Sequence, residues 1–127
     1  MNINIILYVK DQVCSRAFYA AALGMAPRLD VPGMTEFEIS GGCVLGLMPE
    51  KGIKKLLPGM PDPEKAAGLP RAEVYFTVQD PAAFHSRALA AGARELSPLA
   101  ARDWGHRAAY SLDPDGHVLA FAEPLAE

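Results

Sequence analysis

Three observations predict an α+β protein built from two tandem βαβββ units. Residues 113–116, Asp-Pro-Asp-Gly, are a strong reverse-turn signal, because proline presets φ and glycine accepts a left-handed backbone. The run 42–47 aligns with 116–121 as a weaker copy of the same strand. Asp11 and Asp80 each follow an apolar run by two positions, and each precedes a glycine suited to ending a helix. The order strand, helix and three strands therefore occurs twice.

The first unit is predicted to span residues 1–49. Residues 3–9 are β-branched and apolar, which favours a strand, and Asp11 offers the side chain that caps a following helix. That helix is predicted to run from residue 13 to residue 23 and to end at Gly24. Its buried stripe is predicted to consist of Val13, Cys14, Ala17, Phe18 and Ala21. Three short strands, 26–31, 35–40 and 43–48, complete the unit.

Residues 50–70 are predicted to be a linker. The segment is rich in proline, glycine and charged residues, and one short helical turn is expected at residues 53–57. The second unit then covers residues 71–127, with a strand at 72–78. Pro81 suits the first turn of the helix after it, because the missing N–H has no partner there in any case. The buried stripe of this helix is predicted to be Phe84, Ala88 and Ala91, and the last strands are predicted at 94–99, 104–112 and 117–123.

Composition excludes several function classes. The 127 residues carry a formal net charge of −3 and no cluster of lysine and arginine, which argues against nucleic acid as a main partner. Residues 3–9 are too short an apolar run to span a membrane or to serve as a secretion signal, so we expect no membrane association and a cytoplasmic location. Cys14 and Cys43 lack metal-pair spacing and are interpreted as small buried apolar residues.

The usual catalytic arrangements are missing from the sequence. His85, His106 and His117 do not have the spacing of a helical metal site, and each is interpreted as a surface or capping residue. No serine or cysteine lies in a strand-to-helix nucleophile elbow. The sequence therefore gives no sign of covalent catalysis.

Paired motifs in both halves resemble those of a known family. They are Tyr8-Val9-Lys10-Asp11, Phe18-Tyr19, Leu23-Gly24, Trp104-Gly105, Asp113-Pro114-Asp115-Gly116 and Glu123-Pro124. In this order they resemble the vicinal oxygen chelate superfamily, which contains glyoxalase I, bleomycin-resistance proteins, fosfomycin-resistance enzymes and extradiol dioxygenases. The resemblance implies that the strands form a curled mixed sheet around a concave site, and that the protein is a homodimer. Whether the units pair within one chain or swap between chains is left open.

The metal enzymes of that family hold a divalent ion at four strand positions. By the resemblance, and by the internal repeat, these positions fall on Asn4, Gly46, Glu73 and Ala120. Only Glu73 is a strong ligand, because asparagine offers a weak carbonyl oxygen while glycine and alanine offer no side-chain donor. We therefore predict no bound metal and no cofactor. Gly46 and Ala120 are expected to leave room for a larger organic guest.

Strand alternation predicts which residues line the concave side. Asn4 and Tyr8 share one face of the first strand, whereas Leu7 and Val9 point toward the helix. The predicted ligand-binding residues are Asn4, Tyr8, Met48, Glu73, Tyr75, Trp104 and Arg107. Glu73 is also a candidate general base or a partner for a cationic ligand; the alternative is a carboxylate paired with an arginine such as Arg107. Trp104 is expected to begin a strand. It would either offer a flat surface on which an aromatic ligand stacks or have only a packing role within the protein.

Three functions remain open on the sequence. The leading prediction is a small-molecule-binding protein that resembles the bleomycin-resistance branch, sequestering a ligand or antibiotic without a metal and without chemical change. The alternative is an enzyme, a divalent-metal-dependent lyase or isomerase of the glyoxalase I type that uses Glu73. A third is a dimeric module that binds no small guest. The sequence does not decide whether the protein is an enzyme, and it does not name the ligand.

Overall fold

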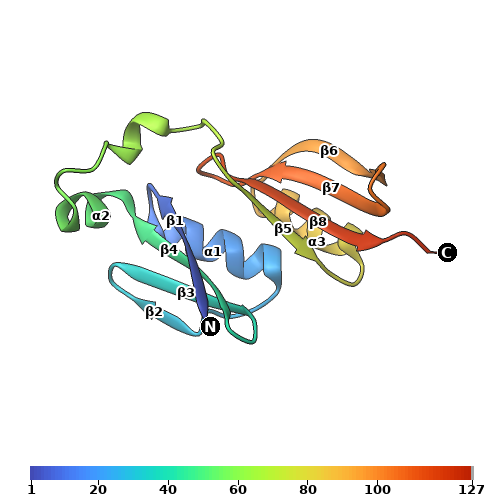
Figure 1. Ribbon diagram of the computed structural model, residues 1–127, viewed down its shortest axis with the longest axis horizontal. Helices are drawn as coiled ribbons and strands as arrows, with labels where there is room; N and C mark the ends of the chain where they lie inside the picture. Colours follow the sequence, from blue (N-terminus) through green and yellow to red (C-terminus); the bar gives the residue numbers. More distant parts are fainter. Residues whose placement is uncertain (127) are drawn as a thin grey trace. The chain divides into compact units, whose positions relative to one another are not determined.

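The computed structural model describes residues 1–126 and divides them into two compact units. The first contains Met1–Ala20 and Met25–Ala67, and the second contains Ala21–Gly24 and the residues from Gly68 onward. Each unit has its own four-stranded mixed sheet (Figure 1). The predicted α+β class and the tandem βαβββ order are therefore confirmed.

The sheet of the first unit has the strand order β1-β4-β3-β2. Its strands are β1 (Ile3–Val9), β2 (Leu29–Val31), β3 (Met34–Ser40) and β4 (Cys43–Pro49), and helix α1 (Gln12–Leu23) connects β1 to β2. Strand β1 pairs in parallel with β4, and the other pairs are antiparallel. The register places Asn4 beside Val44, Ile6 beside Gly46 and Tyr8 beside Met48. These residues share one face of the sheet because alternate side chains point the same way.

The opposite face of this sheet packs against α1. Val9, Phe37 and Leu47 are fully buried there, and the Tyr19 ring lies 6.4 Å from that of Phe37. Gln12 fixes the start of the helix: its amide nitrogen donates to the Val31 carbonyl at 2.8 Å and its amide oxygen accepts from the Gly33 N–H at 2.9 Å. The first unit thus encloses an aromatic and aliphatic core between one helix and one sheet.

The predicted stripe of α1 is partly wrong. The buried residues are Ser15, Phe18, Tyr19, Ala22 and Leu23, whereas Val13, Cys14, Ala17 and Ala21 are exposed. The helix is rotated relative to the prediction because the large Tyr19 ring packs against Phe37 on β3. Cys14 is therefore not a buried apolar residue, and Cys43 is only half-buried.

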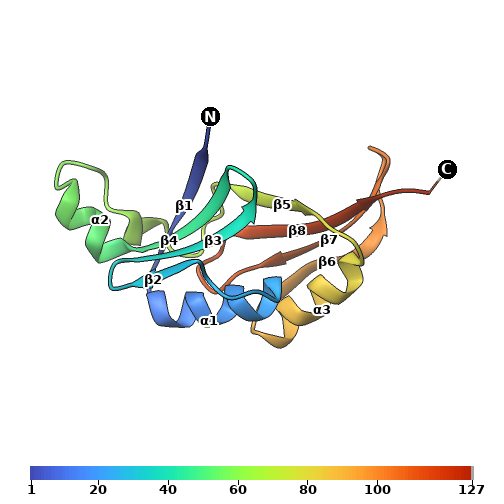
Figure 2. The ribbon, with the colours of Figure 1, turned by 90° about the horizontal axis from the view of Figure 1, so that it is seen from below.

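The sheet of the second unit has the strand order β5-β8-β7-β6. Its strands are β5 (Glu73–Thr77), β6 (Arg94–Ala101), β7 (His106–Leu112) and β8 (Val118–Pro124), with helix α3 (Pro81–Ala90) between β5 and β6. Helix α3 lies on one face of this sheet (Figure 2). Phe121 joins the two layers, because its ring lies 5.3 Å from Phe76 on β5 and 5.4 Å from Phe84 on α3.

His85 contradicts its prediction as a surface or capping residue. The side chain is buried on α3, and its Nε2 lies 2.9 Å from a carboxylate oxygen of Glu95 on β6. Its Nδ1 is buried without a hydrogen-bond partner. The predicted stripe holds at Ala88, which is fully buried, whereas Phe84 and Ala91 are half-buried. His85 lies three residues before Ala88 and therefore shares its side of the helix.

The predicted linker contains two short helices, α2 (Glu50–Leu56) and the 3₁₀ helix η1 (Pro63–Ala66). Ile53 is buried, in the region where one helical turn was expected. Lys54 on α2 forms ion pairs with Asp62 at 3.2 Å and Glu64 at 2.5 Å, which join the two helices. Because these pairs are exposed, they orient the segment more than they stabilise it.

Asp113 organises the predicted reverse turn. Its side chain is buried and accepts the backbone N–H groups of Asp115 at 2.9 Å and His117 at 2.8 Å. Gly116 adopts φ +89°, and a Cβ there would lie 2.9 Å from the Cα of Gly68. Only glycine fits this position, because both the backbone conformation and the close approach exclude a side chain.

Candidate functional site

The candidate site is the face of the second sheet that α3 leaves open. Phe76 and Phe121 point toward α3, so the residues that alternate with them point the other way. The strand register places Tyr75 and Tyr110 on either side of Ala120 on that face. Ala120 is fully buried, so two phenol side chains flank a small residue on the central strand.

Three side chains on this face form a hydrogen-bonded chain. The Trp104 indole Nε1 donates to the Tyr75 hydroxyl oxygen at 3.0 Å, and that oxygen lies 2.6 Å from His106 Nδ1. The Tyr75 and His106 rings also stack, with centroids 5.8 Å apart. Trp104 remains 52% exposed, which leaves much of its surface available to a ligand. We call Tyr75, Trp104, His106 and Tyr110 the Tyr75 cluster.

Trp104 lies in the turn between β6 and β7, and Arg102 holds this turn. The prediction that Trp104 begins a strand is wrong, because β7 starts at His106. The Arg102 guanidinium donates to the carbonyls of Pro98 at 3.0 Å and Ala108 at 2.8 Å, and to Ser97 Oγ at 2.8 Å. It also lies 5.2 Å from the centre of the Tyr110 ring. Arg102 thus fixes the turn that carries Trp104 and covers one side of the cluster.

Glu73 supplies negative charge to this face. Its side chain is exposed at the start of β5, two residues before Tyr75. Burial raises the pKa of the Tyr110 hydroxyl, and the charge of Glu73 raises it further, while Arg102 acts in the opposite direction. Tyr110 therefore stays protonated well into the alkaline range and remains a hydrogen-bond donor.

Arg107 does not neutralise Glu73. Its guanidinium pairs with Glu123 on β8, the residue beside it in the strand register. The alternative in which Arg107 satisfies Glu73 is therefore wrong, because Glu123 is closer in register. Arg107 alternates with His106, so it lies on the α3 side of the sheet, and its place in the predicted ligand site has no support from this geometry.

The remaining predicted ligand residues lie in the first unit. Asn4 is exposed and donates from Nδ2 to Glu36 at 3.3 Å, and Glu36 also pairs with Arg28 at 3.0 Å. Tyr8 and Met48 are half-buried neighbours on β1 and β4. Whether these three residues bind a ligand together with the Tyr75 cluster stays a prediction.

Gly46 does not leave the room that the sequence suggested. A Cβ at this position would lie 3.1 Å from Ile6 Cγ1 and 3.3 Å from the Met34 sulfur. The space that a ligand side chain would need is therefore filled by two apolar neighbours. With Ala120 lacking a donor and the Asn4 amide bound to Glu36, the residues at the four family positions do not fit a divalent ion.

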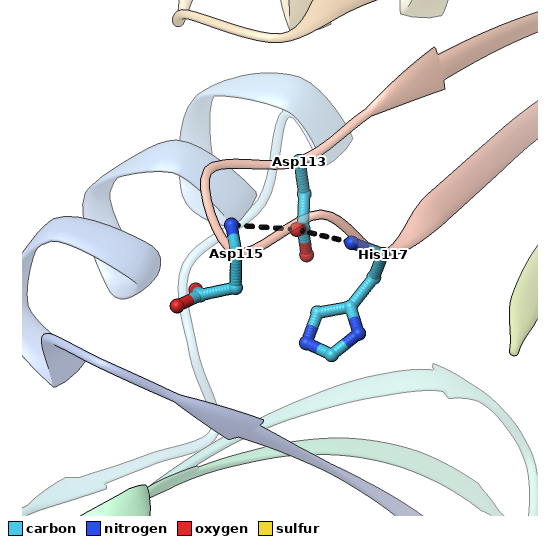
Figure 3. Close-up of side chains that lie close together, drawn as sticks. All are labelled: Asp113, Asp115 and His117. Carbon is cyan, nitrogen blue, oxygen red and sulfur yellow. Dashed lines mark hydrogen bonds between the residues drawn. The ribbon is translucent and has the colours of Figure 1, made fainter. Parts of the chain in front are cut away.

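A different group of potential metal ligands lies at the β7–β8 turn. One ligand atom from each of Asp113, Asp115 and His117 lies within 4.8 Å of the others (Figure 3). One oxygen of Asp113 already accepts the two backbone N–H groups that form the turn. These bonds explain the aspartate at position 113, and they bring Asp115 and His117 close to it through their backbones.

Comparisons with known proteins agree with this architecture. The family model described as "Glyoxalase/Bleomycin resistance protein/Dioxygenase superfamily" matches residues 3–121. The chain belongs to this superfamily, as its motifs indicated. A search of the curated proteins finds no match to this sequence.

Solved structures show the same fold. A glyoxalase-related enzyme from Fulvimarina pelagi has a TM-score of 0.81 at 24% identity, covering 97% of this chain and 87% of that one. A glyoxalase/bleomycin resistance protein/dioxygenase family enzyme from Burkholderia phytofirmans PsJN has a TM-score of 0.79 at 19% identity, covering 96% and 97%. A glyoxalase/bleomycin resistance protein/dioxygenase from Nocardioides has a TM-score of 0.78 at 24% identity, covering 98% and 83%. At these identities the likeness concerns the fold alone.

Within residues 1–126, every helix is too short or too polar to cross a bilayer.

Sequence reasoning missed three members of the site. His106 was interpreted as a surface residue, and neither Tyr110 nor Arg102 was considered. The strand register would have revealed Tyr110, because it lies opposite Ala120, a position already assigned to the concave side. His106 bonds to Tyr75, which is distant in the sequence, and no local pattern predicts that contact. The hydrogen bonds of Arg102 stay within the β6–β7 hairpin, but they depend on how the hairpin folds.

Proposed function

We propose that the protein binds a planar organic molecule against the Tyr75 cluster and holds it without a metal and without changing it. The observation that supports this proposal is the exposed Trp104 ring, held in place by its hydrogen bond to Tyr75. An aromatic side chain fixed before binding offers stacking area at little entropic cost. Ligand sites typically combine such apolar surface with a few placed polar groups, and His106 and Tyr110 are of that kind.

The relatives' names support the same proposal. Several solved structures of this fold carry bleomycin resistance in their titles, among them those from Catenulispora acidiphila and Albidiferax ferrireducens. Sequestration needs a binding surface and no reacting group. Glu73 on the same face would favour ligands with a positive charge at one end.

The sole tryptophan makes the proposal directly testable. We would titrate the protein with planar antibiotics, cationic ones included, and follow Trp104 fluorescence together with calorimetry. The expected result is saturable quenching with unchanged ligand recovered afterwards. Trp104→Ala should weaken calorimetric binding by roughly tenfold, the order of one base-sized stacking contact. Tyr19→Phe, which removes a phenol hydroxyl from the first unit, serves as the control and should bind normally.

The proposal fails if no compound in the panel quenches Trp104 or raises the melting temperature. It also fails if Trp104→Ala binds as tightly as the wild-type protein, since the stacking surface would then be irrelevant. Recovery of a chemically altered ligand would contradict passive sequestration and would favour an enzyme.

The alternative function is a metal-dependent lyase or isomerase. One observation favours it: Glu73 places an exposed carboxylate on the same open face as the Tyr75 cluster. Such an enzyme would need metal ligands besides Glu73 that lie outside the four family positions. Metal analysis of the purified protein distinguishes this function from sequestration.

A further inference from the structure

The hydrogen-bonded chain in the Tyr75 cluster has a fixed direction at its first step. An indole N–H can only donate, so the Tyr75 hydroxyl oxygen accepts from Trp104 across 3.0 Å. The hydroxyl has one proton of its own to give. Where that proton goes determines what the cluster offers to a ligand.

The second step joins the Tyr75 hydroxyl to His106 Nδ1 across 2.6 Å. If Nδ1 carried the proton of a neutral imidazole, the Tyr75 oxygen would accept two hydrogen bonds and its own proton would have no partner within the cluster. If Tyr75 donates instead, each proton in the chain has an acceptor: the Trp104 N–H donates to the Tyr75 oxygen, and the Tyr75 O–H donates to His106 Nδ1. Chains of donors aligned in one direction also strengthen one another.

We infer that Tyr75 holds neutral His106 with its proton on Nε2, so that the cluster presents an N–H donor to its ligand. The part of this inference that concerns the ligand rests on the proposed function. The part that concerns the tautomer of His106 rests on the hydrogen bonds alone. A planar ligand that stacks on Trp104 then needs a hydrogen-bond acceptor at the position of His106. The Glu73 carboxylate on this face would repel an anionic ligand. A neutral carbonyl oxygen is therefore a better acceptor for the His106 Nε2–H than a carboxylate is.

The tautomer is measured without any ligand. Nitrogen NMR of ¹⁵N-histidine-labelled protein at mildly alkaline pH distinguishes the protonated ring nitrogen from the bare one. The expected result is His106 protonated on Nε2 and, in Tyr75→Phe, a mixture of the two tautomers. His117, which lies at the β7–β8 turn with its backbone N–H bonded to Asp113, serves as the internal reference and should not change. An Nδ1-protonated His106 in the wild-type protein would overturn the inference.

The ligand class is tested with a pair of planar compounds of the same shape. 2-Acetylnaphthalene carries a carbonyl where 2-isopropenylnaphthalene carries a CH₂ group. Calorimetry should show the ketone binding roughly five- to tenfold more tightly, the order of one net hydrogen bond. That preference should vanish in His106→Phe. Equal binding of both compounds to the wild-type protein would overturn the assigned ligand class.

The two experiments separate this inference from the proposed function. If neither naphthalene nor any planar antibiotic binds, the proposed function fails and the carbonyl preference fails with it. The tautomer result is independent of that outcome. If both naphthalenes bind equally, the proposed function stands and the donor assignment to the ligand is wrong.

Discussion

Gly116 and Gly68 approach each other so closely that neither the backbone nor the space at Gly116 admits a side chain. We expect Gly116→Ala to lower the free energy of unfolding by about 3 kcal/mol, since it combines a left-handed backbone with a methyl group 2.9 Å from the Gly68 Cα. Gly33→Ala is the matched control, because Gly33 occupies another hairpin turn at φ +96° with no atom near its Cβ. Denaturant unfolding of both variants gives the comparison.

The difference between the losses of unfolding free energy in Gly116→Ala and Gly33→Ala measures the cost of placing a methyl group between Gly116 and Gly68. Equal losses would show that the backbone conformation alone explains the glycine, and that the segment near Gly68 moves aside without cost.

Tyr110 should titrate above the ordinary range of tyrosine. Burial and then Glu73 raise its pKa, so the folded protein holds this proton more tightly than the unfolded chain does. The resulting stabilisation is complete below the unfolded pKa and is lost as the pH rises through the folded pKa. Ultraviolet titration of tyrosinate should show a late component that disappears in Tyr110→Phe. Glu73→Gln should move it to lower pH while leaving it above the ordinary value, because burial is the larger cause.

A late component that does not respond to Glu73→Gln would contradict the electrostatic effect of Glu73 on the pKa of Tyr110. A late component that persists in Tyr110→Phe would assign the raised pKa to another tyrosine.

Single residues show where sequence reasoning stops. Asp113 and Gly116 were predictable, because a reverse turn depends on neighbours in the chain. His85 was not, because its burial depends on Glu95 across the layer between α3 and β6. Cys14 was assigned to the buried stripe by its helical spacing to other apolar residues, but the side of the helix that packs is a different one.

The β6–β7 hairpin is the element on which the candidate site depends most. Arg102 holds it through two carbonyls and a hydroxyl, and Trp104 follows two residues later. We expect Arg102→Gln to lower the fluorescence anisotropy of Trp104 and to weaken ligand binding several-fold, because the turn loses the charge-assisted hydrogen bonds that immobilise it. Global stability should fall by only about 1–2 kcal/mol, since the site is partly exposed.

Arg94→Gln in the same hairpin is the control, because Arg94 pairs with Leu112 at the end of β6 that lies far from the turn. Unchanged anisotropy in Arg102→Gln would show that the turn keeps its conformation without the guanidinium, and that Trp104 is fixed by Tyr75 alone.

At the scale of elements, the sequence predicted the eight strands and the helices α1 and α3, but it missed the 3₁₀ helix η1 and did not always predict which side of a helix is buried. The helix after Asp11 was found where the cap and the glycine placed it, yet its buried side is rotated because Tyr19 outweighs the small residues Ala17 and Ala21. The spacing of apolar residues takes no account of side-chain size. Packing depends on the volume of each side chain and on which residues of the sheet lie opposite it. Phe37 is that partner for Tyr19, and only the register of β3 places it there.

The whole molecule should be free of structural or catalytic metal. Protein purified without chelator or nickel columns is expected to contain no stoichiometric divalent ion, and EDTA should not change its melting temperature. The reason is that two of the four family positions, Gly46 and Ala120, have no donor, while Ile6 and Met34 fill the space at Gly46. Elemental analysis by mass spectrometry and a thermal-shift assay make the measurement.

A stoichiometric ion would contradict this expectation and favour the lyase or isomerase. Two variants would then locate it: loss of the ion in Glu73→Gln would place it on the open face of the second sheet, whereas loss in Asp115→Asn would place it at the β7–β8 turn.

The fold was predictable as a whole because the sequence contains two βαβββ repeats, and the pattern of each repeat supports the interpretation of the other. The site was predictable only in part. Glu73, Tyr75 and Trp104 were identified by strand parity and by the family motifs, and they do lie on one open face or beside it. Arg107 was predicted to line the site, but it lies on the opposite face of the sheet, next in sequence to His106. The faces of β7 are determined by its pairing with β8 and not by the sequence of β7 itself.

Strand β8 lies between β5 and β7, although it is the last strand of its unit to be synthesised. The ribosome therefore releases β5, α3, β6 and β7 before the strand that joins them exists, whereas the first unit has emerged once Ala67 is synthesised. During translation one half can fold early while the other exposes two unpaired strand edges to chaperones and to aggregation. Stop codons or frameshifts shortly before residue 118 should thus leave a folded first half attached to an insoluble remainder.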